Sequence, residues 1–125
     1  MTALPENLLQ AWKNRNAPII LTTVDGDGMP NSIYATCAGN FGEDKLVVAD
    51  NYFNKTRANI KTGTKDTILF MTTDNKAYQV KGTMSYQTEG AVYDDMKCWN
   101  PEQHPGHAAA VLTVEEAYSG GEKLL

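Results

Sequence analysis

Residues 17–39 alternate short runs of β-forming residues with a glycine-rich turn, and this pattern limits the fold more than any other feature of the chain. The run "APIILTTV" (17–24) is rich in Ile, Thr and Val, and "DGDG" follows it before "MPNSIYATCAG" (29–39) resumes an extended pattern. β-Branched residues favour strands, whereas Asp-Gly pairs favour tight turns. The segment therefore predicts a β-hairpin.

Four further strands are expected after this hairpin. "KLVVA" (45–49) follows a turn at 40–44 and is apolar enough to be buried on both faces. Residues 64–74 and 76–90 predict a second hairpin, which turns through Asp74, Asn75 and Lys76. Residues 108–119 predict a last strand, which brings the expected total to six.

Short helices are expected between and before these strands. Apolar residues recur at helical spacing in residues 5–15 and again in 91–99, and "KTRANIK" (55–61) follows the third strand. Antiparallel hairpins with one helix between strands do not repeat the strand-helix-strand order of parallel sheets. The sequence predicts a mainly β protein, a small closed barrel in one domain that spans residues 1–125.

Composition narrows the function classes. The chain of 125 residues carries a formal net charge of −4, which argues against binding nucleic acid by broad phosphate neutralisation. It has no apolar run of the roughly 20 residues that cross a bilayer, and its first residues are too polar for a signal peptide. We therefore expect no membrane contact, a cytoplasmic location and two reduced cysteines, Cys37 and Cys98.

Common catalytic motifs are missing. The sequence holds no dinucleotide fingerprint, no phosphate-binding P-loop and no Gly-x-Ser-x-Gly motif. Its two histidines, His104 and His107, lie in the loop "HPGH" without a nearby carboxylate pattern, so we assign no metal. Adjacent carboxylates at 94–95 and 115–116 point to different faces, so no catalytic acid-base pair is assigned.

A small basic segment stands out in this acidic chain. "DNYFNKTRANIKTG" (50–63) reads as a strand end, a loop and a helix, with Asn51 or Asn54 as its N-cap and Gly63 at its end. Lys55 and Thr56 fall in the first helical turn, where a lysine opposes the helix dipole. The residues alone leave two interpretations open, an anion site or a plain surface helix.

The order of these elements resembles the FMN-binding split barrels related to pyridoxamine 5'-phosphate oxidase, particularly the small bacterial FMN-binding proteins. Four segments carry the resemblance across nearly the whole chain: "DGDGMPNSIYAT", "KLVVADNYFNKTRANI", "YQVKGTMSYQTEG" and "AAAVLTV". The resemblance implies a six-stranded antiparallel Greek-key split barrel with short flanking helices. It also implies a homodimer that holds one FMN per subunit at the subunit interface.

The resemblance also implies site residues. Lys55 and Thr56 would hold the FMN phosphate, Asn31 and Ser32 would add polar contacts, and Ile33 would lie near the flavin. The backbone of Val48, Ala49, Asp50 and Asn51 would run along the isoalloxazine ring. Tyr34 and Tyr52 are expected at the entrance. Trp99 is expected either to form a wall of the ring site from the partner subunit or to be a core residue. Arg57 and Lys61 are expected to be solvated.

Several functions remain open within this resemblance. Pyridoxamine 5'-phosphate oxidases carry a second set of basic phosphate-binding residues, and no arginine follows Arg57 here, so that activity is disfavoured. The leading hypothesis is a redox flavoprotein, an electron carrier or flavin-dependent reductase with an unidentified redox partner. Alternatives are a module that stores or senses FMN, and a relative that binds a deazaflavin or haem. A haem site would need a histidine near the groove.

Overall fold

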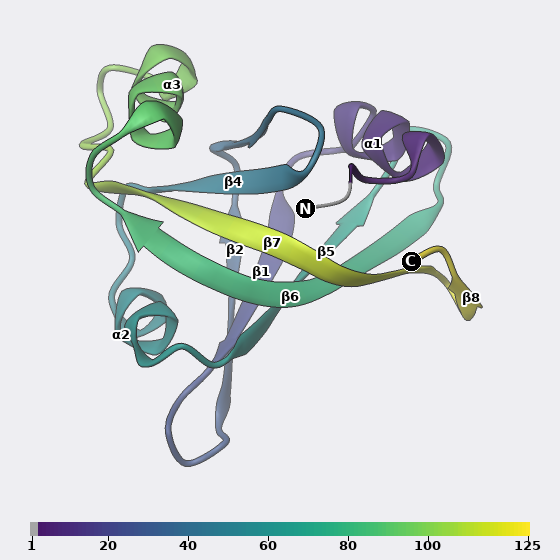
Figure 1. Ribbon diagram of the computed structural model, residues 1–125, viewed down its shortest axis with the longest axis horizontal. Helices are drawn as coiled ribbons and strands as arrows, with labels where there is room; N and C mark the ends of the chain where they lie inside the picture. The colour runs from purple at the N-terminus through teal and green to yellow at the C-terminus, as the bar shows by residue number, and fades with distance from the viewer. Residues whose placement is uncertain (1–2) are drawn as a thin grey trace.

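The predicted hairpins form one curled antiparallel sheet in the computed structural model, which describes residues 3–125 (Figure 1). Its strands are β1 (Ile19–Val24), β2 (Pro30–Ala35), β3 (Ala38–Phe41), β4 (Lys45–Asp50), β5 (Lys65–Met71), β6 (Ala77–Gln87), β7 (Ala108–Ser119) and β8 (Glu122–Lys123). They are ordered β2-β1-β5-β6-β7-β4-β3, and β8 pairs with β7. The expected mainly β split barrel is confirmed.

The strand count differs from the expected six, because the sheet has eight strands. The extended segment expected at 29–39 breaks at Thr36 and Cys37, so that the chain leaves β2 at one end of the strand order and enters β3 at the other. The second addition is β8, which follows a turn at Gly120 with a φ of 57°. The β2–β3 break is the one that shapes the candidate site.

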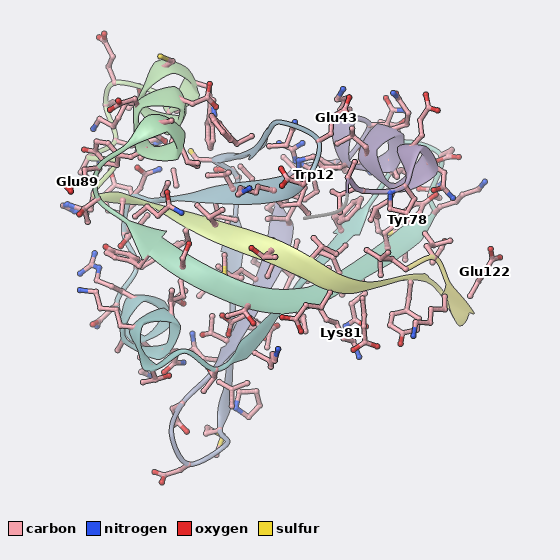
Figure 2. The ribbon with its side chains drawn as sticks, in the orientation of Figure 1. Trp12, Glu43, Tyr78, Lys81, Glu89 and Glu122 are labelled. Atoms are coloured by element: carbon pink, nitrogen blue, oxygen red, sulfur yellow. The ribbon has the colours of Figure 1, made fainter. Side chains whose placement is uncertain are left out.

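The barrel interior is filled by alternate residues of the strands and by α1 (Glu6–Lys13). Trp12 of α1 (Figure 2) is fully buried. It meets Phe70 edge to face, with ring centroids 5.1 Å apart. Its indole nitrogen donates a hydrogen bond to the Gly39 carbonyl at 3.1 Å, and Arg15 Nη2 donates to the Ala38 carbonyl at 2.5 Å. These side chains therefore cover carbonyl groups of β3, an edge strand.

The outer face of β4 and β7 is covered by α3 (Ala91–Trp99). Val92 and Met96 of this helix join Val47, Ala49 and Val111 of the strands in a second buried cluster. Because the opposite face of β4 points into the barrel, this strand is buried on both sides, as its apolar sequence predicts.

The third helix, α2 (Lys55–Thr62), begins four residues after β4 and ends at Gly63, whose φ of 80° is the predicted left-handed conformation. Asn54 takes the N-cap position, but its side chain makes no capping hydrogen bond, and the first turn holds no acidic residue. The helix N-terminus is therefore open to an external acceptor. None of the helices formed by residues 3–125 is long and apolar enough to cross a membrane.

Candidate functional site

A pocket beside the start of α2, which we call the helix pocket, has a volume of about 230 Å³. Its lining comprises Asn31, Ile33, Tyr52, Phe53, Asn54, Lys55 and Thr56. The Thr56 side chain is buried, and Asn31 Nδ2 donates a hydrogen bond to its Oγ1 at 3.1 Å. Among residues 3–125, no carboxylate forms an ion pair with Lys55. This pocket offers a free ammonium group beside an uncapped helix N-terminus.

A second pocket lies where the chain turns from β2 to β3, and we call it the corner pocket. Its volume is about 250 Å³, and residues 33–37, Ala49, residues 51–53 and His104 line it. Tyr34 and Tyr52 line it and are 75% and 72% exposed. The Tyr52 hydroxyl lies 3.0 Å from His104 Nδ1. Most of the wall is apolar side chain, which suits a flat ring.

The helix pocket and the corner pocket form one groove. They share Ile33 of β2 with Tyr52 and Phe53 of the loop between β4 and α2. The groove therefore has a cationic end at Lys55 and an apolar end at the β2–β3 corner. A ligand that spans it needs an anionic group and a flat apolar group.

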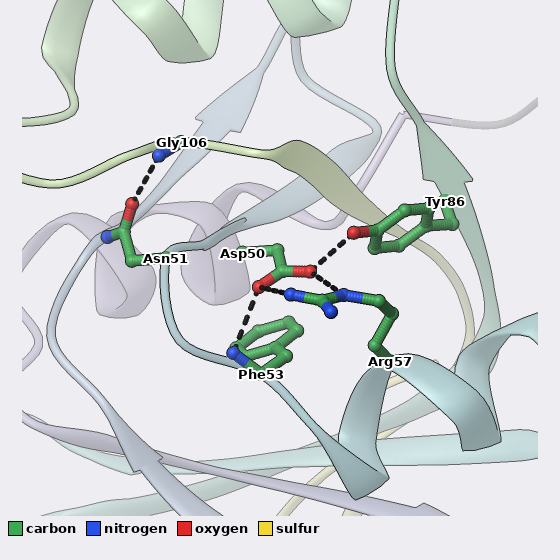
Figure 3. Close-up of polar contacts among 6 residues, drawn as sticks. All are labelled: Asp50, Asn51, Phe53, Arg57, Tyr86 and Gly106. Carbon is green, nitrogen blue, oxygen red and sulfur yellow. Dashed lines mark hydrogen bonds and ion pairs between the residues drawn. The ribbon is translucent and has the colours of Figure 1, made fainter.

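Asp50, the last residue of β4, stands at the centre of a buried network behind this groove (Figure 3). Arg57 Nε donates to its Oδ2 at 2.7 Å, and the Tyr86 hydroxyl donates to the same oxygen at 2.5 Å. The backbone N–H of Phe53 donates to Oδ1 at 3.0 Å. The carboxylate is fully buried and thereby ties the loop 51–54 to α2 and β6.

The hydrogen bonds of this network shift the pKa values of Asp50 and Arg57. Burial alone would raise the pKa of Asp50, but the hydrogen bonds from Arg57, Tyr86 and Phe53 outweigh it and lower that pKa below its ordinary value. The hydrogen bond to Asp50 raises the pKa of Arg57. The expectation that Arg57 is solvated is therefore wrong: its side chain is 34% exposed and its charge is paired with Asp50. Lys55 is left as the free cation of the first helical turn.

Asn51 points the opposite way from Asp50 and holds a second loop (Figure 3). Its Oδ1 accepts hydrogen bonds from the Gly106 N–H and from Asn100 Nδ2, both at 2.9 Å. Its Nδ2 donates to Asn100 Oδ1 at 3.0 Å. These bonds fix residues 100–106 against the groove, which brings His104 to the corner pocket.

The structure brings most of the residues named from the resemblance to this groove. Asn31, Lys55 and Thr56 line the helix pocket, while Ala49 and Asn51 line the corner pocket. Ile33 lines both pockets. The groove thus gathers residues from β2, β4 and α2 that lie up to 25 positions apart.

Three of the named residues lie differently. Ser32 is on the other face of β2 from Asn31, and its hydroxyl meets that of Thr22 at 2.8 Å. Val48 is fully buried in the barrel core, and Asp50 is engaged in the network described above. The Ala49 N–H donates to the Cys37 carbonyl at 2.9 Å, so this backbone group is already paired within the protein.

The sequence did not identify His104 and Arg57 as part of the site region. The histidine reaches the groove because Asn51 binds the backbone of its loop, a contact that spans 55 positions. The arginine is drawn inward by a carboxylate whose burial depends on the whole sheet. Neither contact leaves a local pattern in the sequence.

Known proteins resemble this chain in sequence. Residues 5–119 match the family model described as pyridoxamine 5'-phosphate oxidase. The uncharacterized protein MJ0282 of Methanocaldococcus jannaschii is 27% identical over 122 residues, which cover 93% of this chain and 80% of that protein.

Solved structures of other proteins share the fold. The HupZ protein of Group A Streptococcus superposes with a TM-score of 0.80 at 24% identity and covers 97% of both chains. An FMN-binding protein from Syntrophomonas wolfei superposes with a TM-score of 0.76 at 23% identity, over 90% of this chain and 86% of that one. With the family match over residues 5–119, these likenesses show that the chain belongs to the pyridoxamine 5'-phosphate oxidase family.

Proposed function

We propose that this protein binds FMN in the groove formed by the helix pocket and the corner pocket, and that it acts in redox chemistry as an electron carrier or flavin-dependent reductase. The observation that carries the proposal is the union of a cationic end and a flat apolar end in one groove. FMN has the matching parts, a phosphate and a planar isoalloxazine ring. The FMN-binding protein of the same fold adds support.

The helix pocket suits the phosphate. Backbone N–H groups at the start of α2 lack a side-chain cap, and Lys55 is free of carboxylate partners among the described residues. Phosphates bind at such helix termini because the N–H groups and the dipole both favour negative charge. Thr56 and Asn31, which are joined by a hydrogen bond, supply further polar groups.

The corner pocket suits the ring. Ile33, Ala35, Ala49 and Phe53 provide apolar contact, while Asn51 adds an amide. The bound flavin would supply the redox chemistry. The protein's own residues would hold the cofactor, exclude water from one side of it and limit access at Tyr34 and Tyr52.

A homodimer is part of the proposal. Tyr34, Ile20 and Leu69 are paired in register across β2, β1 and β5, so their side chains share the outer face of the sheet. Tyr34 is 75% exposed and Leu69 38%, which leaves an apolar row available to a second copy. Sedimentation velocity tests this: the wild-type protein should sediment as a dimer and Leu69→Lys as a monomer. A monomeric wild type would contradict the dimer.

A flavin titration tests the function. The purified protein should bind FMN with quenching of flavin fluorescence, and riboflavin should bind more weakly because it lacks the phosphate. Equal affinity for the two flavins would contradict the phosphate site, and no binding of either would overturn the proposal. A storage module is distinguished by anaerobic reduction, because a carrier or reductase should be reduced by a nicotinamide nucleotide or a reduced partner protein.

Haem binding is a second candidate, and His104 favours it. A haem site would need a histidine near the groove. His104 lines the corner pocket, and its Nδ1 forms a hydrogen bond with the Tyr52 hydroxyl. Titration with haemin gives the test. A Soret band that shifts on binding in the wild type, but not in His104→Ala, would favour haem over FMN. The same titration with His107→Ala serves as the control.

A further inference from the structure

A third pocket continues the groove beyond the β2–β3 corner, and we call it the tryptophan pocket. Its volume is about 530 Å³, and it lies between β3 and the end of α3. It shares Thr36, Cys37 and His104 with the corner pocket but shares no lining residue with the helix pocket. The corner pocket therefore adjoins both of the other pockets.

Trp99 forms a flat wall of this pocket. A Cβ atom on Gly39 would lie 3.1 Å from two carbons of the indole ring, so the ring rests directly on the backbone of β3. The indole N–H donates to Asp95 Oδ2 at 3.3 Å, which holds the ring in this orientation. Flat aromatic surfaces fixed in this way favour stacking with other planar rings.

The lining of the tryptophan pocket holds no lysine, arginine or carboxylate side chain. Besides Trp99, it comprises Ala38, Gly39, Asn40 and Pro101 with the three shared residues, and none of these is Lys, Arg, Asp or Glu. A charged ligand would lose hydration there, and of the lining side chains only the His104 imidazole could offer it a charged partner. This contrasts with the helix pocket, where Lys55 is free. The two ends of the groove thus select opposite kinds of chemical group.

We propose that the tryptophan pocket binds an uncharged planar ring of the quinone class, stacked on Trp99. Its role beside the corner pocket rests on the proposed function, with the flavin as the reductant. A quinone takes up two electrons and two protons when it becomes a hydroquinone, and a fully reduced flavin releases the same two electrons and two protons when it is reoxidised. The pocket would therefore admit the acceptor that reoxidises the flavin.

Equilibrium dialysis of the 125-residue chain, without flavin, tests the binding step. The probe is duroquinone, whose fully methylated ring does not add thiols such as Cys37. Chloranilate, a benzoquinone dianion of similar size, is the charged comparison. We expect saturable binding of duroquinone, binding of chloranilate at least about tenfold weaker, and loss of about tenfold in duroquinone affinity for Trp99→Ala.

Two further variants keep the test decisive. Tyr93→Ala removes an aromatic ring from the same helix without touching the pocket, so it should bind duroquinone like the wild type. Gly39→Ala pushes the indole away from β3 and should weaken binding even if Trp99→Ala fails to fold. Absence of saturable binding by the wild type, or wild-type affinity in Gly39→Ala and every folded Trp99 variant, would overturn the inference.

Dialysis in the presence of FMN separates this inference from the proposed function. Duroquinone affinity should change less than about threefold when FMN saturates the protein, because the two ligands occupy different pockets. Loss of duroquinone binding on addition of FMN would overturn the separate pocket. Quinone binding by a protein that binds no FMN would leave the tryptophan pocket standing and refute the proposed function, and the reverse result would do the opposite.

Discussion

The guanidinium of Arg57 meets the buried carboxylate of Asp50 through Nε at 2.7 Å, and this contact joins the end of β4 to the start of α2. The loop 51–54 lies between the two residues and lines both parts of the groove. Its position therefore depends on an ion pair that itself lies outside the groove.

Asp50→Asn tests this dependence. The substitution keeps the size of the side chain but removes the charge that Arg57, Tyr86 and the Phe53 N–H share. We expect the free energy of unfolding to fall by roughly 2–4 kcal/mol, since the buried network loses its negative charge and an NH2 group replaces one of the two acceptor oxygens. Urea denaturation measures the effect. Asp27→Asn, an isosteric change on an exposed loop, should shift the midpoint little, and equal losses in the two variants would refute the structural role of Asp50.

Lys55→Ala tests the phosphate end of the groove. We expect FMN affinity to fall about tenfold or more, because a charge-assisted contact to the phosphate is lost, while riboflavin affinity stays near the wild-type value. Fluorescence titration measures both ligands. The matched control is Lys61→Ala in the last turn of the same helix, where the ammonium lies 4.8 Å from the Tyr86 ring centroid. If FMN and riboflavin lose affinity equally, Lys55 acts on folding and not on the phosphate.

Asp66 should make stability depend on pH. Its side chain is 1% exposed, and neither carboxylate oxygen has a hydrogen-bond partner among the described residues. Burial raises the pKa of Asp66 from 3.8 to about 7. The folded state therefore binds the proton more tightly than the unfolded chain does. The resulting stability is complete below pH 4 and is lost as the pH rises through 7, at about 1.4 kcal/mol for each pKa unit.

Urea denaturation between pH 4 and 8 measures this contribution. Asp66→Asn keeps the shape and removes the titration, so the difference in stability between variant and wild type should move in favour of the variant as the pH rises. Asp94→Asn on α3 provides the exposed comparison. Parallel pH profiles for wild type and Asp66→Asn would show that Asp66 keeps an ordinary pKa.

Gly82 should not tolerate a side chain. It lies at an irregularity in the pairing of β6 with β7, and a Cβ atom there would come within 1.9 Å of the Thr113 carbonyl oxygen. Gly82→Ala must displace the backbone of one strand, so we expect a loss of more than about 3 kcal/mol or failure to fold. Thermal unfolding gives the measurement. Gly121→Ala, which meets nothing within 4 Å, should melt near the wild-type temperature.

Periodicity explains how much of the fold the sequence reveals. The hairpins, the doubly buried β4 and the helix end at Gly63 all follow from local patterns of β-branched, apolar and glycine residues. The break between β2 and β3 does not, because Thr36 and Cys37 are compatible with a continuous strand. The strands separate because β2 pairs with β1 whereas β3 pairs with β4, and this pairing depends on contacts across the sheet.

Local sequence patterns also reveal only part of the candidate site. The place of Lys55 and Thr56 in the first turn of a helix could be predicted from the local sequence, and a lysine there opposes the helix dipole, which leaves an anion site as one interpretation. Arg57, only two residues later, has the same local appearance, yet its charge is taken by Asp50. His104 is placed by Asn51, through contacts that no neighbouring residue in the sequence reveals.

The arrangement of β2 and β3 has a consequence for how a ligand would affect the whole molecule. These strands are the two ends of the sheet, yet only Thr36 and Cys37 separate them in the chain. The two end strands of the barrel are thus joined by a short segment of the chain, and not by hydrogen bonds between strands. The side chains of Trp12 in α1 and of Arg15, which follows that helix, donate hydrogen bonds to carbonyls of β3, and the groove runs along β2. A ligand bound in the groove would contact β2 on the side where no neighbouring strand pairs with it. Hydrogen exchange of the β2 amides should therefore slow when the groove is occupied.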